Sequence, residues 1–210
     1  MRLGIFGGTF DPVHYGHLLL AEWCREACAL DEVWFIPAAI APHKQHQSAA
    51  TAADRIEMLR LASGGYPAMF VSPMEIERGG VSYTVDTLAE IRARRGDAEL
   101  FLLMGSDSLA DLIHWREPER ICELSLPVVV HRGGTPEPDF GPLAAIVSPE
   151  RIDAIRKHVV AMPQVELSSS EIRRRAAEGK SIRFQTPRAV EAYIESHGLY
   201  RQPPTAGASP

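Results

Sequence analysis

Cysteine, positive charge and long apolar stretches are all scarce in this sequence. Three cysteines among 210 residues are too few, and odd in number, for a disulfide framework. The N-terminus leads directly into a short apolar segment, with no signal peptide and no stretch long enough to span a bilayer. We therefore expect a cytoplasmic protein in a reducing setting, with no membrane partner.

The charge balance argues against another class of partner. The formal net charge is -5, whereas a general nucleic-acid binder needs a basic face to displace counterions. We expect no nucleic-acid partner. Small polyanionic ligands stay open, because a few local arginine, lysine and histidine side chains suffice to bind a triphosphate.

Two common nucleotide-binding motifs are also absent. The sequence has no G-x-x-x-x-G-K-[ST] loop and no G-x-G-x-x-G fingerprint, so a P-loop kinase and a dinucleotide-dependent dehydrogenase lose support. Cys24 and Cys28 lie on one expected helix, but no second pair of ligands with matching spacing completes a zinc site. We expect both to pack inside the protein and expect no metal held by side chains.

What the sequence does contain is an alternation of short apolar segments and helical patterns. This alternation is typical of βαβ units and a mostly parallel sheet, and the nearly all-apolar strands indicate helices on both faces. The expected strands are Arg2–Phe6, Glu32–Ile36, Ala68–Val71, Glu99–Met104, Leu126–Val130 and Gln164–Leu167. The expected helices between them are His17–Ala29, Ala53–Ala62, Thr84–Arg94, Ser108–His114 and Pro149–Arg156. The fold class is therefore α/β, with a Rossmann-like, doubly wound sheet.

The C-terminal part of the chain changes character. Two helices, Ser168–Glu178 and Pro187–His197, follow one another with no strand between them, and Gly179 suits the end of the first. We expect residues 1–201 to form a single domain with a helical C-terminal portion. Residues 202–210 are rich in proline, alanine and glycine, and we expect them to be a disordered tail.

Unusual residues gather in the loops that follow the expected strands. In an open parallel sheet, ligands bind beyond the carboxyl ends of the strands, at a switch point of the strand order. The first such loop reads Gly7-Gly8-Thr9-Phe10-Asp11-Pro12-Val13-His14-Tyr15-Gly16-His17. Its glycines let the backbone approach a phosphate closely, and the next helix offers free N–H groups. His14 and His17 can both point at one anion, so this loop predicts a phosphate site.

The same loop resembles the signature of the nucleotidyltransferase superfamily with an H-x-G-H motif, and most closely that of bacterial nicotinate-nucleotide adenylyltransferases. The resemblance extends over nearly the whole chain, from Leu3 to Tyr200. It implies an enzyme of NAD biosynthesis that joins ATP and nicotinate mononucleotide to give nicotinate adenine dinucleotide and pyrophosphate. It also implies that His14 and His17 hold the ATP phosphates, and that the rest of the ATP site in this loop is formed by Gly7, Gly8, Thr9 and Phe10.

Lys44 lies in the loop after the second expected strand, within Ala41-Pro42-His43-Lys44. A lysine there can bring a mobile positive charge over the phosphates, and the resemblance to Pro-His-Lys implies a catalytic and substrate-binding role. The family often carries asparagine and proline where Ala38 and Ala41 stand, so any side-chain contact from an asparagine is lost here.

Ser82, Tyr83 and Thr84 precede the third expected helix. Helix capping explains a serine or threonine at such a start, and backbone N–H groups there can also hold a carboxylate. The resemblance implies that this segment binds the pyridine substrate, with Thr84 on the nicotinate carboxylate. It further implies that Trp115 stacks on the pyridine ring. Arg116 replaces an aromatic residue common in the family and contributes to the same substrate site.

Two further segments complete the predicted ATP site. Gly105 and Asp107 follow the fourth expected strand; Asp107 suits a helix N-cap and, by resemblance, accepts hydrogen bonds from the adenosine ribose. Ser168 with Glu171 forms a capping-box pattern. The remaining polar groups at that helix start face an anion, and the resemblance implies phosphate binding by Ser169, Ser170 and Arg173.

These residues suggest a mechanism without a catalytic nucleophile or general base. The ionised phosphate of the mononucleotide attacks the α-phosphorus of ATP in line, and the protein positions the groups and stabilises charge through His14, His17, Lys44 and Arg173. Mg²⁺ is expected to bridge the ATP phosphates, mostly hydrated. Three alternatives stay open: nicotinamide mononucleotide as acceptor, phosphopantetheine as acceptor, and a non-catalytic nucleotide-binding module. Homo-oligomerisation is also open.

Overall fold

The computed structural model describes residues 1–42, 49–134 and 136–201. Within these ranges, six strands form one sheet in the order β3-β2-β1-β4-β5-β6, and every neighbouring pair is parallel. The chain first adds strands on one side of β1 and then crosses to the other side, which places the switch point between β1 and β4. The strands are β1 (Arg2–Gly8), β2 (Glu32–Pro37), β3 (Met69–Val71), β4 (Glu99–Gly105), β5 (Leu126–Arg132) and β6 (Val159–Met162).

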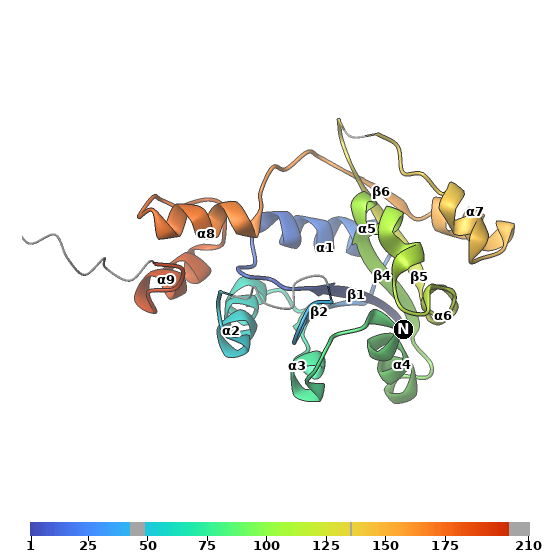
Figure 1. The fold of residues 1–210 in the computed structure, drawn as a ribbon, viewed down its shortest axis with the longest axis horizontal. Coiled ribbons are helices and arrows are strands. Elements are labelled where there is room, and N and C mark those ends of the chain that lie inside the picture. The colour runs from blue at the N-terminus through green and yellow to red at the C-terminus, as the bar shows by residue number, and fades with distance from the viewer. Residues whose placement is uncertain (43–48, 135, 202–210) are drawn as a thin grey trace, which may run out of the picture.

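Helices flank the sheet, and α8 and α9 lie at the opposite end of the view from α7 (Figure 1). The α-helices are α1 (Tyr15–Ala27), α2 (Ala52–Ser63), α3 (Met74–Arg78), α4 (Thr84–Arg94), α5 (Ser106–Asp111), α6 (Pro118–Leu124), α7 (Pro149–Arg156), α8 (Ser169–Ala177) and α9 (Arg188–Ser196). Two short 3-10 helices are η1 (Leu112–His114) and η2 (Gly141–Ala145). None of the helices in the described ranges has both the length and the apolarity needed to cross a membrane.

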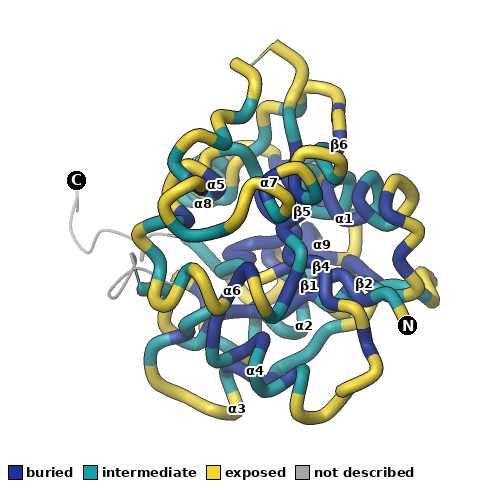
Figure 2. The backbone as a smooth tube through the Cα atoms, turned by 90° about the vertical axis from the view of Figure 1, so that its right-hand side faces the viewer, coloured by how far each residue is buried: buried dark blue, intermediate teal, exposed yellow. Residues whose placement is uncertain are grey.

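The alternating side chains of the strands form two hydrophobic cores, one on each face of the sheet. Phe6 and Phe35 face a core shared with α1, α2, α8 and α9, whereas Ile5 and Ile36 face a core shared with helices α3 to α7. The central strands are therefore buried on both faces, as the dark blue tube shows (Figure 2). This double burial explains why the strands read as continuous apolar segments.

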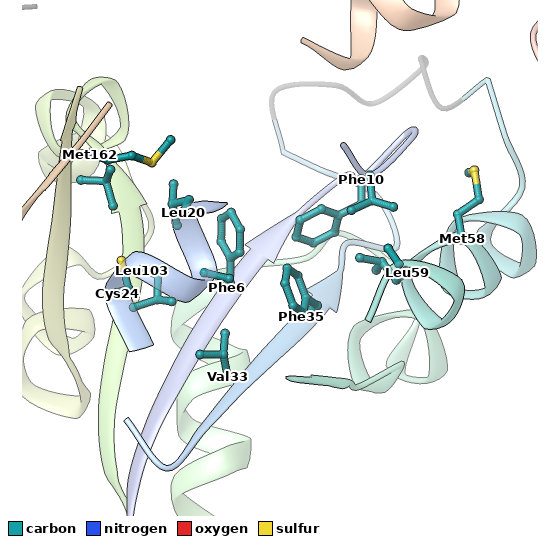
Figure 3. Close-up of a cluster of buried hydrophobic side chains, with 14 of the residues drawn as sticks. Phe6, Phe10, Leu20, Cys24, Val33, Phe35, Met58, Leu59, Leu103 and Met162 are labelled. Carbon is teal, nitrogen blue, oxygen red and sulfur yellow. The ribbon is translucent and has the colours of Figure 1, made fainter. Parts of the chain in front are cut away.

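The first core extends to the residues that follow β1. The rings of Phe6, Phe10 and Phe35 pack against one another with centroids 5.4 to 5.8 Å apart (Figure 3). Phe10 has a positive φ of 51°, which is a strained conformation for an aromatic residue. A Cβ on Gly8 would lie 2.9 Å from the Phe10 ring. Gly8 therefore leaves the space that Phe10 needs to anchor this loop in the core.

The structure confirms the α/β class, the parallel sheet and helices on both faces, and it corrects some elements. The last strand is Val159–Met162, which pairs with β5; the prediction of Gln164–Leu167 was wrong. Both segments are apolar in part, but only Val159–Met162 has a neighbouring strand to pair with. Helices α3 and α6 were missed because they span only 5 and 7 residues.

The two predicted C-terminal helices and the predicted packing of Cys24 and Cys28 inside the protein are confirmed. Helices α8 and α9 follow one another without a strand, and Gly179 adopts a positive φ of 67°. Cys24 and Cys28 are reduced and buried in the first core. Residues 202–210, the predicted tail, lie outside the described residues.

Candidate active site

Two adjoining cavities lie at the carboxyl ends of β1 and β4, each of about 450 Å³. We call one the basic cavity; its lining includes His14, His17, Arg132 and Arg173. We call the other the aromatic cavity; its lining includes Tyr83, Thr84, Trp115 and Arg116. Four residues border both cavities: Phe6, Thr9, Gly105 and Ser108. The two cavities therefore meet at the switch point of the sheet, where the fold predicts a ligand.

Gly7 and Gly105 keep this junction open. Gly7 borders the aromatic cavity, and Gly105 borders both cavities. A Cβ on either glycine would have no heavy atom within 4 Å, so the protein's own packing does not require glycine there. Because glycine has no side chain, the space at the strand ends stays open, and a ligand can approach the backbone closely there.

His14 and His17 stack at the start of α1. Their ring centroids are 3.7 Å apart, and the backbone N–H of His14 donates to Nδ1 of His17 at 3.2 Å. A neutral imidazole that accepts at Nδ1 carries its proton on Nε2, so His17 has a donor for an anion. A Cβ on Gly16 would lie 3.0 Å from Nδ1 of His14. Glycine at this position thus allows the imidazole stack, which explains the spacing of the motif.

His14 is a neutral group at neutral pH. Burial, followed by the positive charge of Arg132, lowers the pKa of His14 to about 4. Its Nδ1 is buried and has no hydrogen-bond partner among the described residues. It lies over the start of α1, where the side chains of His14 and His17 meet the backbone in a reciprocal capping-box arrangement. An uncharged imidazole can still donate one hydrogen bond.

Arg173 and Arg132 bring positive charge to the basic cavity from two distant segments. Arg173, in α8, donates from Nη1 to the carbonyl oxygen of Asp11 at 2.7 Å and from Nη2 to Oγ of Ser170 at 3.3 Å. Arg132 is the last residue of β5 and borders the same cavity. Arg132 was not among the residues predicted from the sequence. Its position at the end of a strand is the same feature from which the other site residues were predicted.

The serines at the start of α8 divide their roles. Ser168 caps the helix by accepting from the backbone N–H of Glu171 at 3.2 Å. Only this half of the predicted capping box forms, because the Glu171 carboxylate pairs with Arg174 at 2.6 Å instead. Ser169 donates to the carbonyl oxygen of Pro12 at 2.8 Å. Ser169 and Ser170 both border the basic cavity, and their hydroxyl oxygens can still accept a hydrogen bond there.

Asp107 lies exposed at the rim of the basic cavity. The N-cap of α5 is Gly105, so the capping alternative for Asp107 was wrong. The neighbouring Ser106 donates to the carbonyl oxygen of Val130 at 3.0 Å and ties the end of β4 to β5. Asp107 therefore sits in the first turn of a short helix that is fixed to the sheet.

The aromatic cavity is lined at the start of α4 and after η1. Thr84 is the first residue of α4, and the first backbone bonds run from Asp86 and Thr87 to the carbonyl oxygen of Tyr83. The amides before them have no acceptor within the helix, so they are available to a ligand. Trp115 is half-buried and packs against the second core while it borders the cavity.

Arg116 lies over the Tyr83 ring, with its guanidinium carbon 4.7 Å from the ring centroid. It also approaches the Asp86 carboxylate, at 3.8 Å. Arg116 is thus a cation that covers an aromatic ring of the same cavity.

Ser82 has a structural role that differs from capping. Its hydroxyl accepts from the backbone N–H of Ala39 at 2.9 Å, and no side chain caps α4. This bond fixes the loop that follows β2.

Arg55 is buried and contacts the same loop. It donates to the carbonyl oxygens of Thr9 and Ala38 at 2.9 and 2.8 Å. Arg55 therefore joins the loops after β1 and β2, a role that was not predicted from the sequence.

Lys44 lies outside the described residues. Phe10 borders the basic cavity but is only 2% exposed, and its ring packs edge-on against His17 with centroids 5.0 Å apart. Phe10 therefore contributes by holding the His17 ring in place.

Comparison with known proteins identifies the family of this chain. A family model described as cytidylyltransferase-like matches residues 5–175. A "Probable nicotinate-nucleotide adenylyltransferase" of Thermomicrobium roseum is 48% identical over 202 residues, covering 95% of this chain and 92% of that protein. A protein of the same name from Thermus thermophilus is 45% identical, over 96% of this chain and 100% of its own length.

Solved structures show the same fold. The nicotinic acid mononucleotide adenylyltransferase of Plasmodium falciparum complexed with NaAD superimposes with a TM-score of 0.74, at 18% identity, over 95% of this chain and 97% of that one. The fold and site define a cytidylyltransferase-like nucleotidyltransferase. Within that class, the chain belongs to the nicotinate-nucleotide adenylyltransferase family. The predicted family, enzyme class and place in NAD biosynthesis are thereby confirmed.

Proposed function

We propose that the two cavities divide the substrates of an adenylyl transfer from ATP to nicotinate mononucleotide. The ATP phosphates lie in the basic cavity, and the pyridine ring lies in the aromatic cavity. The observation that carries this proposal is the contact between the two cavities at Phe6, Thr9, Gly105 and Ser108. Two substrates bound on either side of this junction bring their phosphates together at the strand ends.

The reaction needs positioning and charge stabilisation. An oxygen of the mononucleotide phosphate attacks the α-phosphorus of ATP, the bond to the β-phosphate oxygen breaks, and pyrophosphate leaves. The attacking phosphate is already ionised, so no general base is required. Arg173, Arg132 and Lys44 offset the negative charge, while His14 and His17 donate as neutral imidazoles. Mg²⁺ bound to the ATP phosphates would add further positive charge there.

The start of α4 supports nicotinate as the pyridine. A carboxylate offers only acceptors, and the free amides at Thr84 and the next residue offer only donors. A carboxamide turns an NH₂ group toward one of these donors and loses that bond. Trp115 supplies the face on which the ring stacks, and Asp107 accepts from the ribose hydroxyls of ATP at the rim of the other cavity.

Pyrophosphate release tests the choice of acceptor. The enzyme would be supplied with ATP, Mg²⁺ and one of three acceptors: nicotinate mononucleotide, nicotinamide mononucleotide or phosphopantetheine. We expect the highest kcat/KM with nicotinate mononucleotide. A higher value with nicotinamide mononucleotide would overturn the assigned role of Thr84, and release only with phosphopantetheine would overturn the use of the aromatic cavity. No release with any acceptor would support the non-catalytic module.

A further inference from the structure

Asp11 is a buried carboxylate that the proposed chemistry does not use. It lies in the loop of Gly7–His17, which we call the phosphate loop, and it is 1% exposed. Its two oxygens accept from the backbone N–H groups of Ala49 and Ala50 at 2.8 and 3.2 Å, and from the hydroxyl of Tyr200 at 2.7 Å. One carboxylate thus joins the phosphate loop to two segments that are distant in the sequence.

The backbone of the phosphate loop is held by the same end of the chain. Three successive carbonyl oxygens, those of residues 11 to 13, accept side-chain donors at 2.7 to 2.9 Å. The donors are, in order, Arg173, Ser169 and Thr186. In addition, the backbone N–H of Tyr15 donates to the carbonyl oxygen of Gln185 at 3.1 Å. Backbone groups of a loop need such external partners because no ladder satisfies them.

We propose that the start of α8, residues 185–186 and Tyr200 act as a clamp that sets the shape of the phosphate loop, with Tyr200 as a positioning residue for His14 and His17. The contacts with the loop come from three parts of the C-terminal region: the start of α8, the connection between α8 and α9, and the residues after α9. The inference rests on the proposed role of the two histidines in phosphate binding. It assigns to Tyr200 an effect on turnover, although Tyr200 borders neither cavity.

The backbone conformation of Tyr200 supports its role as a positioning residue. It has a positive φ of 66°, which is costly for a residue with a Cβ and persists only where the surroundings compensate. The compensation is visible: the side chain packs against the first core, and its hydroxyl reaches Asp11. Burial and the adjacent Asp11 carboxylate raise the pKa of Tyr200, so the hydroxyl stays protonated and donates.

Removing this hydroxyl leaves Asp11 with one donor fewer. The carboxylate is buried beside the guanidinium of Arg55 and holds the end of the segment that precedes α2. Because an unsatisfied buried charge is costly, we expect Asp11 to shift toward its remaining donors and to carry the phosphate loop with it. His14 follows Asp11 by three residues, so such a shift moves the imidazole pair relative to the α-phosphorus.

A matched pair of tyrosine variants tests the clamp. Tyr193 also donates its hydroxyl to a carboxylate, that of Asp54 at 2.9 Å, but this bond joins α9 to α2 and does not contact the phosphate loop. We expect Tyr200→Phe to lower kcat about tenfold, as a fraction-of-an-ångström misplacement predicts. The KM for nicotinate mononucleotide stays near the wild-type value, because that substrate binds in the other cavity. We expect Tyr193→Phe to lower the unfolding temperature while kcat stays unchanged.

Two further variants separate the possible failures. Thr186→Val removes the donor to the carbonyl oxygen of Val13, and we expect it to lower kcat about as much as Tyr200→Phe. If Tyr200→Phe does not fold, the kcat of Thr186→Val alone tests the clamp. If Tyr200→Phe and Thr186→Val both turn over like Tyr193→Phe, the clamp is overturned. The role of the histidines is judged separately by His17→Ala: full turnover in that variant would overturn the proposed function, whatever the tyrosine variants do.

Discussion

The basic and aromatic cavities are built in different ways. The basic cavity takes its polar and charged walls from distant segments that include the phosphate loop, the end of β5, the start of α5 and the start of α8. Hydrogen bonds to loop carbonyls hold these segments together. In the aromatic cavity, the side chains assigned to the pyridine substrate lie on two short continuous segments, at residues 82–84 and 115–116, where Tyr83 and Trp115 pack against the second core. One half of the site therefore depends on long-range polar contacts, and the other on local packing.

This difference has a functional reason. Phosphates carry charge that must be met by donors from several directions, and one helix start or one loop provides few of these. A flat pyridine ring needs an aromatic face and a few aligned amides, which a single turn and a helix start can supply. We expect variants in the basic cavity to affect kcat or the KM for ATP, and variants in the aromatic cavity to affect the KM for the mononucleotide.

The largest effect is expected for His17→Ala. It removes an aligned donor to the transferring phosphates, and loss of one such donor typically lowers kcat about 10² to 10³-fold. The unfolding temperature should change little, because His17 is only partly buried. Steady-state kinetics and thermal unfolding of the same preparation measure both. His197→Ala, at the exposed end of α9, is the matched histidine control; equal turnover in the two variants would contradict the role of His17.

The second prediction concerns pH and His14. Its pKa is lowered from 6.5 to about 4, so between these values the unfolded chain binds the extra proton and the native protein does not. Stability therefore increases as pH rises from about 4 to 6.5 and is lost as pH falls through this window. Across this window, the protonation of His14 changes the unfolding free energy by about 3 kcal/mol.

His14→Gln tests this linkage. Glutamine does not titrate, so we expect a shallower fall of the unfolding free energy between pH 6.5 and 4 than in the wild-type protein. Urea unfolding at several pH values gives the two slopes. Identical slopes would mean that His14 is solvated enough to take up a proton in the native state.

The third prediction is a reciprocal pair. Arg132→Ala should raise the KM for ATP about tenfold, with the KM for nicotinate mononucleotide unchanged, because the lost charge-assisted contact is worth about 1.5 kcal/mol. Trp115→Ala should do the reverse, since stacking on an aromatic ring contributes about 0.5 to 1.5 kcal/mol beyond burial. Kinetics with each substrate varied in turn measure all four constants. If both variants raise the same KM, the division of substrates between the cavities is wrong.

The sequence predicts local features of this site better than distant ones. His14 and His17 were found because a glycine between them and a strand before them are visible in one short segment. Their stacking and the neutral state of His14 depend on burial and on Arg132, which the fold brings from the end of β5. Arg132 was missed because the predicted strand ended at Val130, two residues before the observed end of β5.

The errors in the fold have the same origin. The sixth strand was placed at Gln164–Leu167, where residues alternate in exposure without a strand partner, and not at Val159–Met162, which pairs with β5. The link from Tyr200 to Asp11 spans 189 residues and has no signal in either segment alone. Pairing partners that are distant in the sequence are set by the whole fold.

The smallest effect is expected for Arg116→Ala, which tests how far the aromatic cavity depends on its rim. The Arg116 guanidinium lies over Tyr83, and its ion pair with Asp86 is half-exposed. An exposed cation–π contact contributes about 0.5 to 1 kcal/mol, and an exposed ion pair contributes little. We therefore expect at most about a threefold rise in the KM for nicotinate mononucleotide.

Arg95→Ala is the matched control for Arg116→Ala. The Arg95 guanidinium lies over Trp34 at 5.6 Å from the ring centroid, and neither residue borders a cavity. We expect this variant to leave both KM values unchanged. A rise of tenfold or more in Arg116→Ala, with Arg95→Ala normal, would mean that the guanidinium contacts the substrate itself. In that case charge would contribute to mononucleotide binding, and the aromatic cavity would depend on a polar contact as well as on packing.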